Sequence, residues 1–333
     1  KLAKGGIRFT HGYTAPLCGP SRAMILTGRY AFRTGAVNQD MVGQIKPENE
    51  VLIPSVLKTA GYTSAMVGKW SQFGLTPKDF GFDDYITFQG SGDYWATEKK
   101  KSENYIENGV NKKLDTLTYM PDLMHQHLVD FITTNKDKPF FLYYSMVHVH
   151  SLIQRTPDSK PGSDLYADNT AYMDKLVGKL LSVLDDLKLK ENTLIVFMGD
   201  NGTASIYSER GTIGGKALSG KKGSMLECGS LVPTIASWPG VIEPGNVSDL
   251  LIDSSDIIYM YEDEDGGFWF DENRDYYGEL DYYVSYKGEK EEPFKMLYMD
   301  FELLKNACFA LNLKCELILE GKHYDYLAKI TVL

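Results

Sequence analysis

The chain alternates short apolar runs with amphipathic segments. A continuous apolar run bounded by polar residues is typical of a strand that is buried on both faces. This pattern predicts buried strands at 63–68, 139–147 and 193–198, and we expect a further strand at 232–238.

Helical spacing governs several of the segments between these runs. It predicts helices at 51–61, 121–135 and 168–187, the first of which is closed by Gly61. Strands separated by helices along 51–240 favour a mostly parallel central sheet with helices on both faces. The sequence therefore predicts an α/β fold class for this part of the chain.

Two stretches lack a clear period. Residues 80–118 are rich in Gly, Asp and Tyr, so we expect loops and short hairpin pieces there. Residues 203–224 are rich in Gly and Ser and carry several lysines, which favours a mobile basic loop.

The C-terminal residues 256–333, called the tail below, have a different pattern. Tyrosines alternate with charged residues from Tyr276 to Tyr286, as suits antiparallel strands. We expect a helix at 300–312 and strands at 315–319 and 328–333. The tail should thus be a smaller C-terminal α+β region with antiparallel strands.

The distribution of charge along the 333 residues also changes at the start of the tail. The net charge is −10. All of it comes from residues 256–333, which contain 18 acidic and 8 basic side chains and ten of the 22 tyrosines. We therefore expect one domain at 1–255 and an acidic, Tyr-rich subdomain at 256–333. An acidic chain is a poor candidate for binding nucleic acid, and no apolar run is long enough to span a membrane.

The ends and the cysteines add little. Lys1–Gly6 looks like the end of a helix, so we expect the sequence to begin inside a domain. None of the four cysteines has zinc-site spacing. Cys308 and Cys315 could form a disulfide or could be two apolar side chains of a small core.

The stretch 18–29, C-G-P-S-R-A-M-I-L-T-G-R, carries the most chemistry. Pro20 is suited to open a helix and Gly28 to end it. Cys18 would then lie at a helix N-terminus, which favours anions, and Arg22 one turn later could reach the same anion. Taken alone, the pattern also allows a buried structural cysteine or a thiolate of lowered pKa.

Polar residues follow three of the predicted strands. Lys69 comes after the first, His148-Val149-His150 after the second, and Asp200-Asn201 after the third. Ligand sites of open α/β sheets lie at such strand ends. The two histidines could bind a metal, and Asp200 with Asn201 could offer oxygen ligands to a hard cation. Each signal is weak alone, since a solvated lysine or a plain D-N-G turn is common.

Together these motifs resemble a known family. C-x-P-S-R followed by L-T-G-R is similar to the signature of the type I sulfatases, formylglycine-dependent arylsulfatase-like enzymes of the alkaline phosphatase-like superfamily. Further matches follow in family order: G-K-W at 68–70, P-F-F-L-Y-Y with His150, G-D-N-G at 199–202, Lys222 with G-S-M-L-E-C-G, and W-P-G at 238–240. The resemblance covers about residues 3–255.

The resemblance implies hydrolysis of sulfate esters through a formylglycine nucleophile made from Cys18. It implies that Lys69, His150 and Lys222 bind sulfate oxygens and that Arg22 holds residue 18. His150 or Lys222 would give a proton to the leaving alcohol. By the same resemblance, Asp200, Asn201 and residue 18 would hold Ca²⁺, with Mg²⁺ as an alternative.

It also implies partners and a compartment. These are a sulfated small molecule or glycan as substrate, a formylglycine-generating maturation enzyme, and export to a periplasmic, secreted or lysosome-like location.

The chain departs from the family pattern in three ways. The N-terminal strand with a metal-binding Asp pair is absent from this sequence. Ser71-Gln72 follows Trp70 where the family usually has His, a role that His148 could fill. Residues 256–333 match nothing characteristic of sulfatases. Two alternatives therefore stay open: a phosphate or phosphonate ester hydrolase of the same superfamily, and a non-catalytic relative without its metal site.

Overall fold

A computed structural model of the chain divides into two compact units. The first consists of Lys1–Gly6 and His11–Pro244, and the second of Ile7–Thr10 and Gly245–Leu333. The structure describes residues 2–72, 74–88, 94–95, 104–115, 117–213, 215–245, 250–255, 279–282, 285–286, 289–290, 294–311, 313–321 and 325–332.

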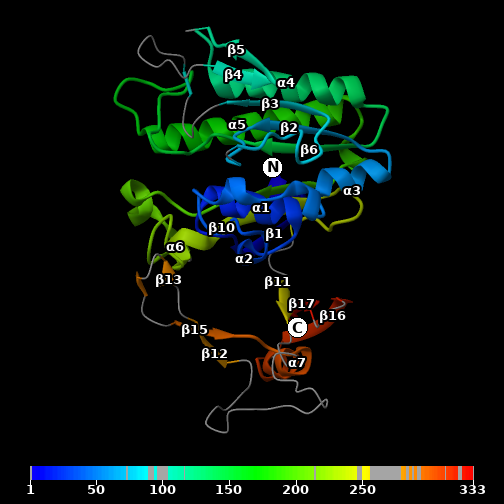
Figure 1. Ribbon diagram of the computed structural model, residues 1–333, viewed down its shortest axis with the longest axis vertical. Coiled ribbons are helices and arrows are strands. Elements are labelled where there is room, and N and C mark those ends of the chain that lie inside the picture. The colour runs from blue at the N-terminus through cyan, green and yellow to red at the C-terminus, as the bar shows by residue number, and fades with distance from the viewer. Residues whose placement is uncertain are drawn as a thin grey trace. The chain divides into compact units, whose positions relative to one another are not determined.

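The largest described sheet of the first unit has five strands (Figure 1). Its strand order is β5 (Val110–Lys113), β4 (Asn104–Glu107), β3 (Asp84–Phe88), β2 (Thr63–Gly68), β6 (Phe140–Ser145). The central strand β2 pairs in parallel with both β3 and β6. The outer pairs β3–β4 and β4–β5 are antiparallel. Parallel strands therefore lie where helices cover the sheet, as their burial requires.

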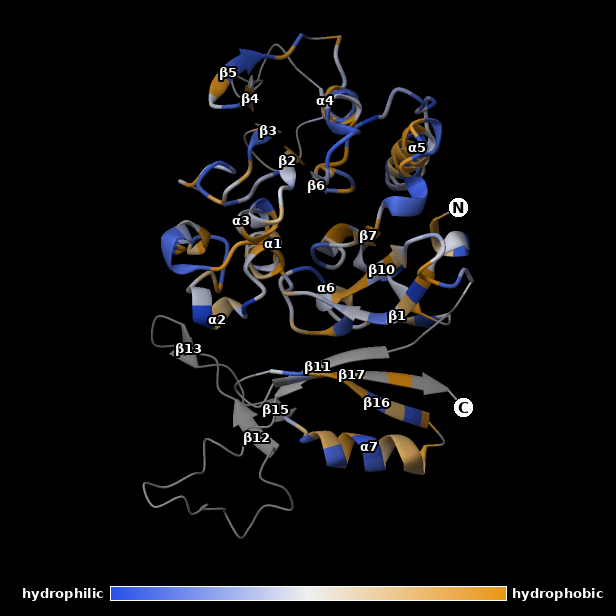
Figure 2. Cartoon of the chain, turned by 90° about the vertical axis from the view of Figure 1, so that its right-hand side faces the viewer, coloured by the Kyte–Doolittle hydropathy of each residue, from blue (hydrophilic) through white to orange (hydrophobic). Residues whose placement is uncertain are grey.

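Alternate residues of these strands supply two separate cores. Val67 and Ile86 pack with helices α4 (Met120–Asn135) and α5 (Leu165–Asp186). Their neighbours Met66 and Tyr85 instead join the core that contains Ala23 and Leu26 of α1 (Cys18–Thr27). The period of two in a strand places successive side chains on opposite faces. Helices consequently cover both faces of the sheet, and α5 shows a hydrophobic side in Figure 2.

Strand β10 (Leu231–Ser237) of the first unit pairs with β7 (Ile195–Met198). Strand β1 (Ile7–Tyr13) is divided, since Ile7–Thr10 belong to the second unit and the rest to the first. Strands β10 and β7 are antiparallel, with Thr234 opposite Met198. The remaining elements of the first unit are short. They are α2 (Ala31–Thr34), α3 (Ile53–Thr59), α6 (Glu227–Ser230), β8 (Thr212–Ile213), β9 (Lys216–Ala217) and 3-10 turns at Leu2–Gly5, Val42–Gln44, Pro47–Asn49, Lys190–Asn192 and Ser205–Arg210.

Most of the predicted elements are confirmed, and the α/β class with them. Three details differ. Strand β3 lies inside 80–118, where we expected only loops and hairpin pieces. The five-stranded sheet is mixed, because β3–β4 and β4–β5 are antiparallel, and β10 also runs antiparallel to β7. Strand β6 is an edge strand of its sheet, and its residues Phe140–Tyr144 are half-buried instead of buried on both faces; β7 is likewise only partly buried, with Val196 56% exposed.

The second unit contains α7 (Phe301–Ala310) and an antiparallel sheet of order β11 (Leu250–Ser255), β17 (Asp325–Val332), β16 (Leu313–Glu320). Two further strand pairs are antiparallel: β12 (Glu279–Tyr282) with β15 (Phe294–Leu297), and β13 (Ser285–Tyr286) with β14 (Glu289–Lys290). The expected helix and antiparallel strands are thus present, while residues 276–278 and 283–284 lie outside the described residues.

Cys308 and Cys315 are both free and lie in the apolar core of α7 and its sheet. Burial and the neighbouring Cys308 raise the pKa of the Cys315 thiol to about 11. Both side chains therefore serve here as apolar core residues in their reduced form.

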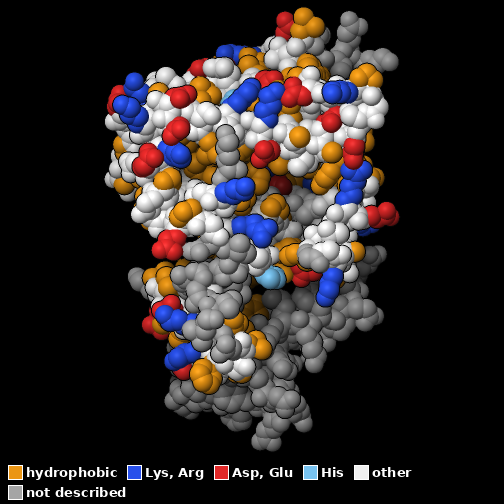
Figure 3. Space-filling model, turned by 180° about the vertical axis from the view of Figure 1, so that it is seen from behind, with side chains coloured by type: hydrophobic (Ala, Val, Ile, Leu, Met, Phe, Trp, Pro, Cys, Tyr) orange, Lys and Arg blue, Asp and Glu red, His pale blue; other side chains and the backbone are white. Residues whose placement is uncertain are grey.

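Two surface properties bear on partners. Among the described helices, none has both the length and the apolar character needed to cross a bilayer. On the face seen in Figure 3, Lys and Arg side chains are interspersed with Asp and Glu. That mixture differs from the basic stripe typical of nucleic-acid-binding surfaces.

Gly68 ends β2 and sets the position of Lys69. Its φ is +109°, and a Cβ there would lie 2.1 Å from the backbone oxygen of Ser145 on β6. Gly68→Ala should therefore lower the free energy of unfolding by about 1–3 kcal/mol, from backbone strain and the clash. Urea denaturation measures the change.

The matched control is Gly178→Ala in α5, where a Cβ meets nothing within 4 Å. This substitution should raise the free energy of unfolding by about 0.5–1 kcal/mol because alanine favours the helix. Equal effects at the two glycines would contradict the proposed constraint at Gly68.

Candidate active site

Helix α1 begins at Cys18, as the position of Pro20 predicts. It ends at Gly28, whose φ of 64° is left-handed and whose N–H donates to the Met24 oxygen. The hydroxyl of Ser21 donates to the Ala15 oxygen at 2.8 Å and so holds the entering chain against the first turn. The predicted local structure of 18–28 is thereby confirmed, and Cys18 lies in the first turn of the helix.

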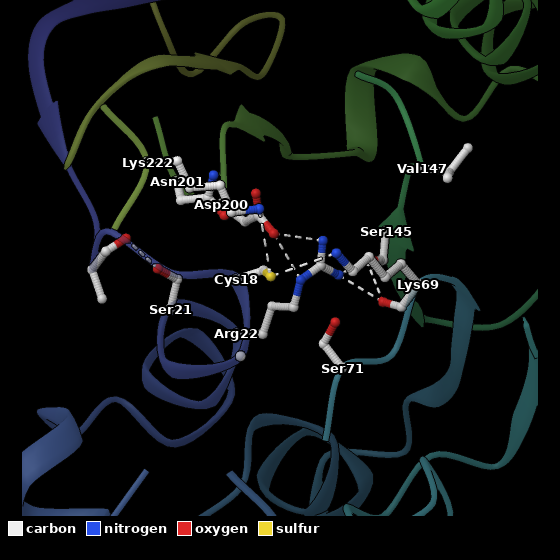
Figure 4. Close-up of polar contacts among 12 residues, drawn as sticks. Cys18, Ser21, Arg22, Lys69, Ser71, Ser145, Val147, Asp200, Asn201 and Lys222 are labelled. Carbon is white, nitrogen blue, oxygen red and sulfur yellow. Dashed lines mark hydrogen bonds and ion pairs between the residues drawn. The ribbon is translucent and has the colours of Figure 1, made fainter. Parts of the chain in front are cut away.

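Two ammonium groups converge on the Cys18 thiol (Figure 4). Lys69 Nζ lies 3.5 Å from Cys18 Sγ, and Lys222 Nζ lies 3.8 Å from it. Burial opposes ionisation of this thiol, but the charges of Lys69 and Lys222 outweigh it and lower the pKa of Cys18. Three residues that are far apart in the sequence thus form one positively charged centre around a nucleophile.

Burial of Lys69 has a second effect. Only 2 % of this residue is exposed, and desolvation lowers the pKa of its ammonium to about 8. The residue is positioned by the end of β2, where its N–H donates to the Ser145 oxygen at 2.8 Å. Lys222 is held at its own N–H, which donates to the Thr203 oxygen at 2.7 Å.

Arg22 connects α1 to the strand ends. Its Nε donates to Asp200 Oδ2 at 2.9 Å, and its Nη2 lies 2.7 Å from the same oxygen. Its Nη1 donates to the Lys69 oxygen at 2.6 Å and to the Ser145 hydroxyl. Burial opposes ionisation of the Asp200 carboxyl, but Arg22 and then Lys69 hold its pKa below the ordinary value. The structure gives Arg22 no hydrogen bond to Cys18, the residue it was predicted to hold.

Asp200 and Asn201 form the turn after β7. The Asn201 amide nitrogen donates to the Gly202 oxygen at 2.8 Å, while its Oδ1 is buried without a hydrogen-bond partner. Hard oxygens of this kind are the ligands that Ca²⁺ prefers, although it takes about six to eight of them. Among the described residues, no group of three or more His, Cys, Asp or Glu could hold a metal ion. The pair therefore fits one part of a calcium shell.

The two histidines after β6 have different surroundings. Burial, followed by the charges of Lys69 and Lys222, lowers the pKa of His150 to about 4, so this ring belongs to the same electrostatic centre. His148 instead faces the rings of Tyr94, Tyr119 and Tyr172 and hydrogen-bonds the Tyr119 hydroxyl at 3.1 Å. Burial lowers the pKa of His148 to about 4 as well.

The structure thus brings Cys18, Lys69, Lys222, Arg22 and Asp200 into one cluster, with His150 and Asn201 beside it. Sequence reasoning missed Ser145, which receives the Arg22 hydrogen bond, and Gln39, whose Oε1 lies 3.4 Å from Cys18 Sγ. Ser145 could have been noticed in the sequence, because it is a polar residue inside an apolar run. No sequence feature points to Gln39, because its contact with Cys18 forms only when the loop that carries it folds.

Such a cluster can bind a tetrahedral oxyanion beside a nucleophile. Two lysines supply positive charge where oxygens of the anion would lie. The same physics serves phosphoryl and sulfuryl transfer, in which positioning and electrostatics supply most of the catalysis.

Comparison with known proteins gives a consistent result. The family model described as Sulfatase matches residues 1–260. The chain is 34% identical to mouse (Mus musculus) N-acetylgalactosamine-6-sulfatase over 289 residues, which covers 75% of this chain and 54% of that protein. It is 30% identical to human (Homo sapiens) arylsulfatase A over 291 residues, covering 78% and 57%. The chain spans about half the length of these curated relatives.

Solved structures agree. The structure of Ps i-CgsB in complex with k-i-k-neocarrahexaose is 28% identical, has a TM-score of 0.61, and is matched over 74% of this chain and 61% of its own.

Proposed function

The chain belongs to the sulfatase family, and from that premise we propose that it hydrolyses sulfate esters to inorganic sulfate and an alcohol. One observation carries the proposal. Lys69 and Lys222 approach Cys18 Sγ at 3.5 and 3.8 Å, at the first turn of a helix. That arrangement suits a covalent nucleophile next to an anionic group.

Formylglycine at position 18 would supply a hydrated aldehyde, and thus a hydroxyl nucleophile for the sulfur of the ester. The rest of the site binds and orients. Lys69 and Lys222 would hold sulfate oxygens and stabilise charge that develops on them. Arg22 would act one step away, by fixing Asp200 and the Lys69 carbonyl. His150 would contact a sulfate oxygen through its neutral imidazole ring.

The low pKa of His150 decides between the two candidates for the proton donor. A histidine whose pKa is about 4 is almost entirely unprotonated at pH 7, so His150 can donate a hydrogen bond but is a poor acid. We therefore assign the proton for the leaving alcohol to Lys222.

We propose a sulfated glycan as the substrate. Two findings support this class: one similar protein is named N-acetylgalactosamine-6-sulfatase, and one similar structure is described as a complex with k-i-k-neocarrahexaose. We further infer, from family membership, a formylglycine-generating enzyme as maturation partner and export from the cytoplasm. Cell fractionation of the source organism tests the location, and a strictly cytoplasmic protein would contradict it.

Parallel assays with an aryl sulfate and the matching aryl phosphate test the reaction. We expect kcat/KM for the sulfate to exceed that for the phosphate. The reverse preference would favour the phosphate or phosphonate hydrolase of the same superfamily. Absence of both activities in protein that carries the aldehyde would favour the non-catalytic relative.

Removal of a divalent cation should lower both activity and thermal stability. Asp200 and Asn201 would hold Ca²⁺, or Mg²⁺, which lowers the pKa of a bound hydroxyl and neutralises anionic charge. A cation at 100 times its Kd stabilises the native state by about 2.7 kcal/mol. EDTA should therefore lower Tm, and added Ca²⁺ should restore it.

The matched variant is Asn201→Ala, because Asn201 Oδ1 has no other partner. Its Tm should respond less to Ca²⁺ than that of the wild type. A wild-type Tm that is identical with EDTA and with Ca²⁺ would contradict a resident cation in this chain.

A further inference from the structure

The first turn of α1 lacks a local cap. The residue before the helix is Leu17, whose side chain cannot accept a hydrogen bond, and no side-chain cap is formed there. The first N–H groups of a helix have no hydrogen-bond partner within the helix and need acceptors from other parts of the structure. Gln39, from the loop after α2, provides one: its Oε1 accepts the Gly19 N–H at 3.0 Å.

The same oxygen also reaches the residue that would become the nucleophile. Cys18 Sγ lies 3.4 Å from Gln39 Oε1, within the range of a thiol donating to an amide oxygen. One uncharged acceptor thus contacts both the side chain of residue 18 and the backbone of residue 19. Residue 18 is thereby held between Gln39 and the two lysines.

The absence of a side chain at Gly19 makes room for Gln39. A Cβ at this position would lie 2.9 Å from Gln39 Nε2 and 2.5 Å from Val42 Cγ1. On its other side, the Gly19 oxygen accepts from Gln72 Nε2 at 2.9 Å, and Gln72 is only 1% exposed. The peptide groups on both sides of Gly19 are therefore fixed by glutamine amides.

Gln39 also connects the nucleophile to the segment that carries Lys69. Its Nε2 approaches the Ser71 oxygen at 3.5 Å, and Ser71 is a buried residue with a φ of 61°. Such a backbone conformation is unfavourable for serine and persists only where neighbours hold it. The amide thus spans the distance between residue 18 and the turn that follows Lys69.

We propose that Gln39 is a positioning residue for the residue-18 nucleophile, which it orients through an uncharged amide oxygen. The proposal rests on the proposed function, because it assigns a role within the same site. A neutral acceptor fits this place, since a carboxylate would oppose the anion that Lys69 and Lys222 attract. After conversion of Cys18, the same oxygen would accept a hydroxyl proton of residue 18.

Three variants test the proposal. Gln39→Leu removes both polar atoms at similar volume. Gln39→Glu keeps an oxygen acceptor and adds charge. Gln44→Leu is the matched control, because Gln44 lies on the same segment and is exposed. Rates are expressed per aldehyde, which is quantified by mass spectrometry, so that poorer maturation is not mistaken for slower catalysis.

In Gln39→Leu, kcat should fall about 10- to 100-fold while KM stays within about twofold, since a misplaced nucleophile slows chemistry and not binding. Gln39→Glu should recover most of kcat and raise KM. Gln44→Leu should match the wild type in both constants. Wild-type kcat in Gln39→Leu, or equal loss in Leu and Glu variants, would overturn the proposal.

A second readout does not depend on activity. Hydrogen–deuterium exchange at segment 18–22 should be faster in Gln39→Leu than in wild type and close to wild type in Gln39→Glu, because the Gly19 N–H keeps an acceptor. It is measured on the thiol form without substrate. If aldehyde-bearing wild type hydrolyses no sulfate ester, the proposed function fails, and exchange alone then decides on Gln39. Unchanged exchange in Gln39→Leu would overturn its contact with α1.

Discussion

Cys18→Ala and Cys18→Ser should abolish aryl sulfate hydrolysis while leaving the fold intact. Neither side chain is the thiol from which formylglycine is made, so the nucleophile is lost. Loss of a covalent nucleophile typically lowers kcat by at least about 10⁴-fold. Cys18 is a small residue in the first helical turn, so the Tm should change little. Initial rates and thermal unfolding, measured on the same preparations, give both quantities.

The control is Cys315→Ser in the second unit, a half-buried thiol of α7's sheet. This variant should retain wild-type turnover. Turnover by Cys18→Ser that approaches the wild-type rate would exclude a formylglycine nucleophile at this position.

Arg22→Met should lower the free energy of unfolding by about 1–3 kcal/mol, because it leaves the half-buried Asp200 carboxylate, whose side chain is 29% exposed, without its guanidinium partner. The basis is local: Arg22 is 5% exposed and binds Asp200 through both Nε and Nη2. The same variant should lower kcat/KM, since the Lys69 carbonyl loses the hydrogen bond from Arg22 and keeps only that from the Ser145 hydroxyl. Urea denaturation and steady-state kinetics measure the two effects.

Arg210→Met provides the comparison. Arg210 pairs with Asp164 at 2.6 Å, and both side chains are 48% exposed. Exposed pairs contribute about 0–1 kcal/mol, so this variant should be close to the wild type in stability and activity. Similar losses in the two variants would contradict a special role for the Arg22–Asp200 pair.

Local patterns predicted local structure well. The start of α1 beside Pro20, its end at Gly28, and the buried strand β2 with Lys69 after it each depend on nearby residues, and each is confirmed. Strand β3 escaped prediction because its five residues lie in a stretch dominated by Gly, Asp and Tyr. The antiparallel β10–β7 pairing could not be read from either strand, because direction depends on long-range partners.

In the site too, features set by nearby residues were predicted, whereas contacts between distant residues were not. Its signature at 18–29 and the ordered strand ends pointed to the family, which the family model confirms. The partner of Arg22 lies 178 residues away, and no local pattern names it. Gln39 was missed for a related reason: a glutamine in a loop has no periodicity or spacing, and only the fold brings it to Cys18. The roles of the site residues therefore rest on the contacts described here and on the variants above.

The mass of the tryptic peptide Phe9–Arg22, taken from a preparation that releases sulfate from an aryl sulfate, tests the central claim most directly. The peptide contains Cys18 and lies between two arginines. We expect it to be lighter than the thiol form, by replacement of sulfur with oxygen and loss of two hydrogens. A peptide that carries only the unmodified thiol, in a preparation of full activity, would contradict formylglycine-dependent sulfate ester hydrolysis.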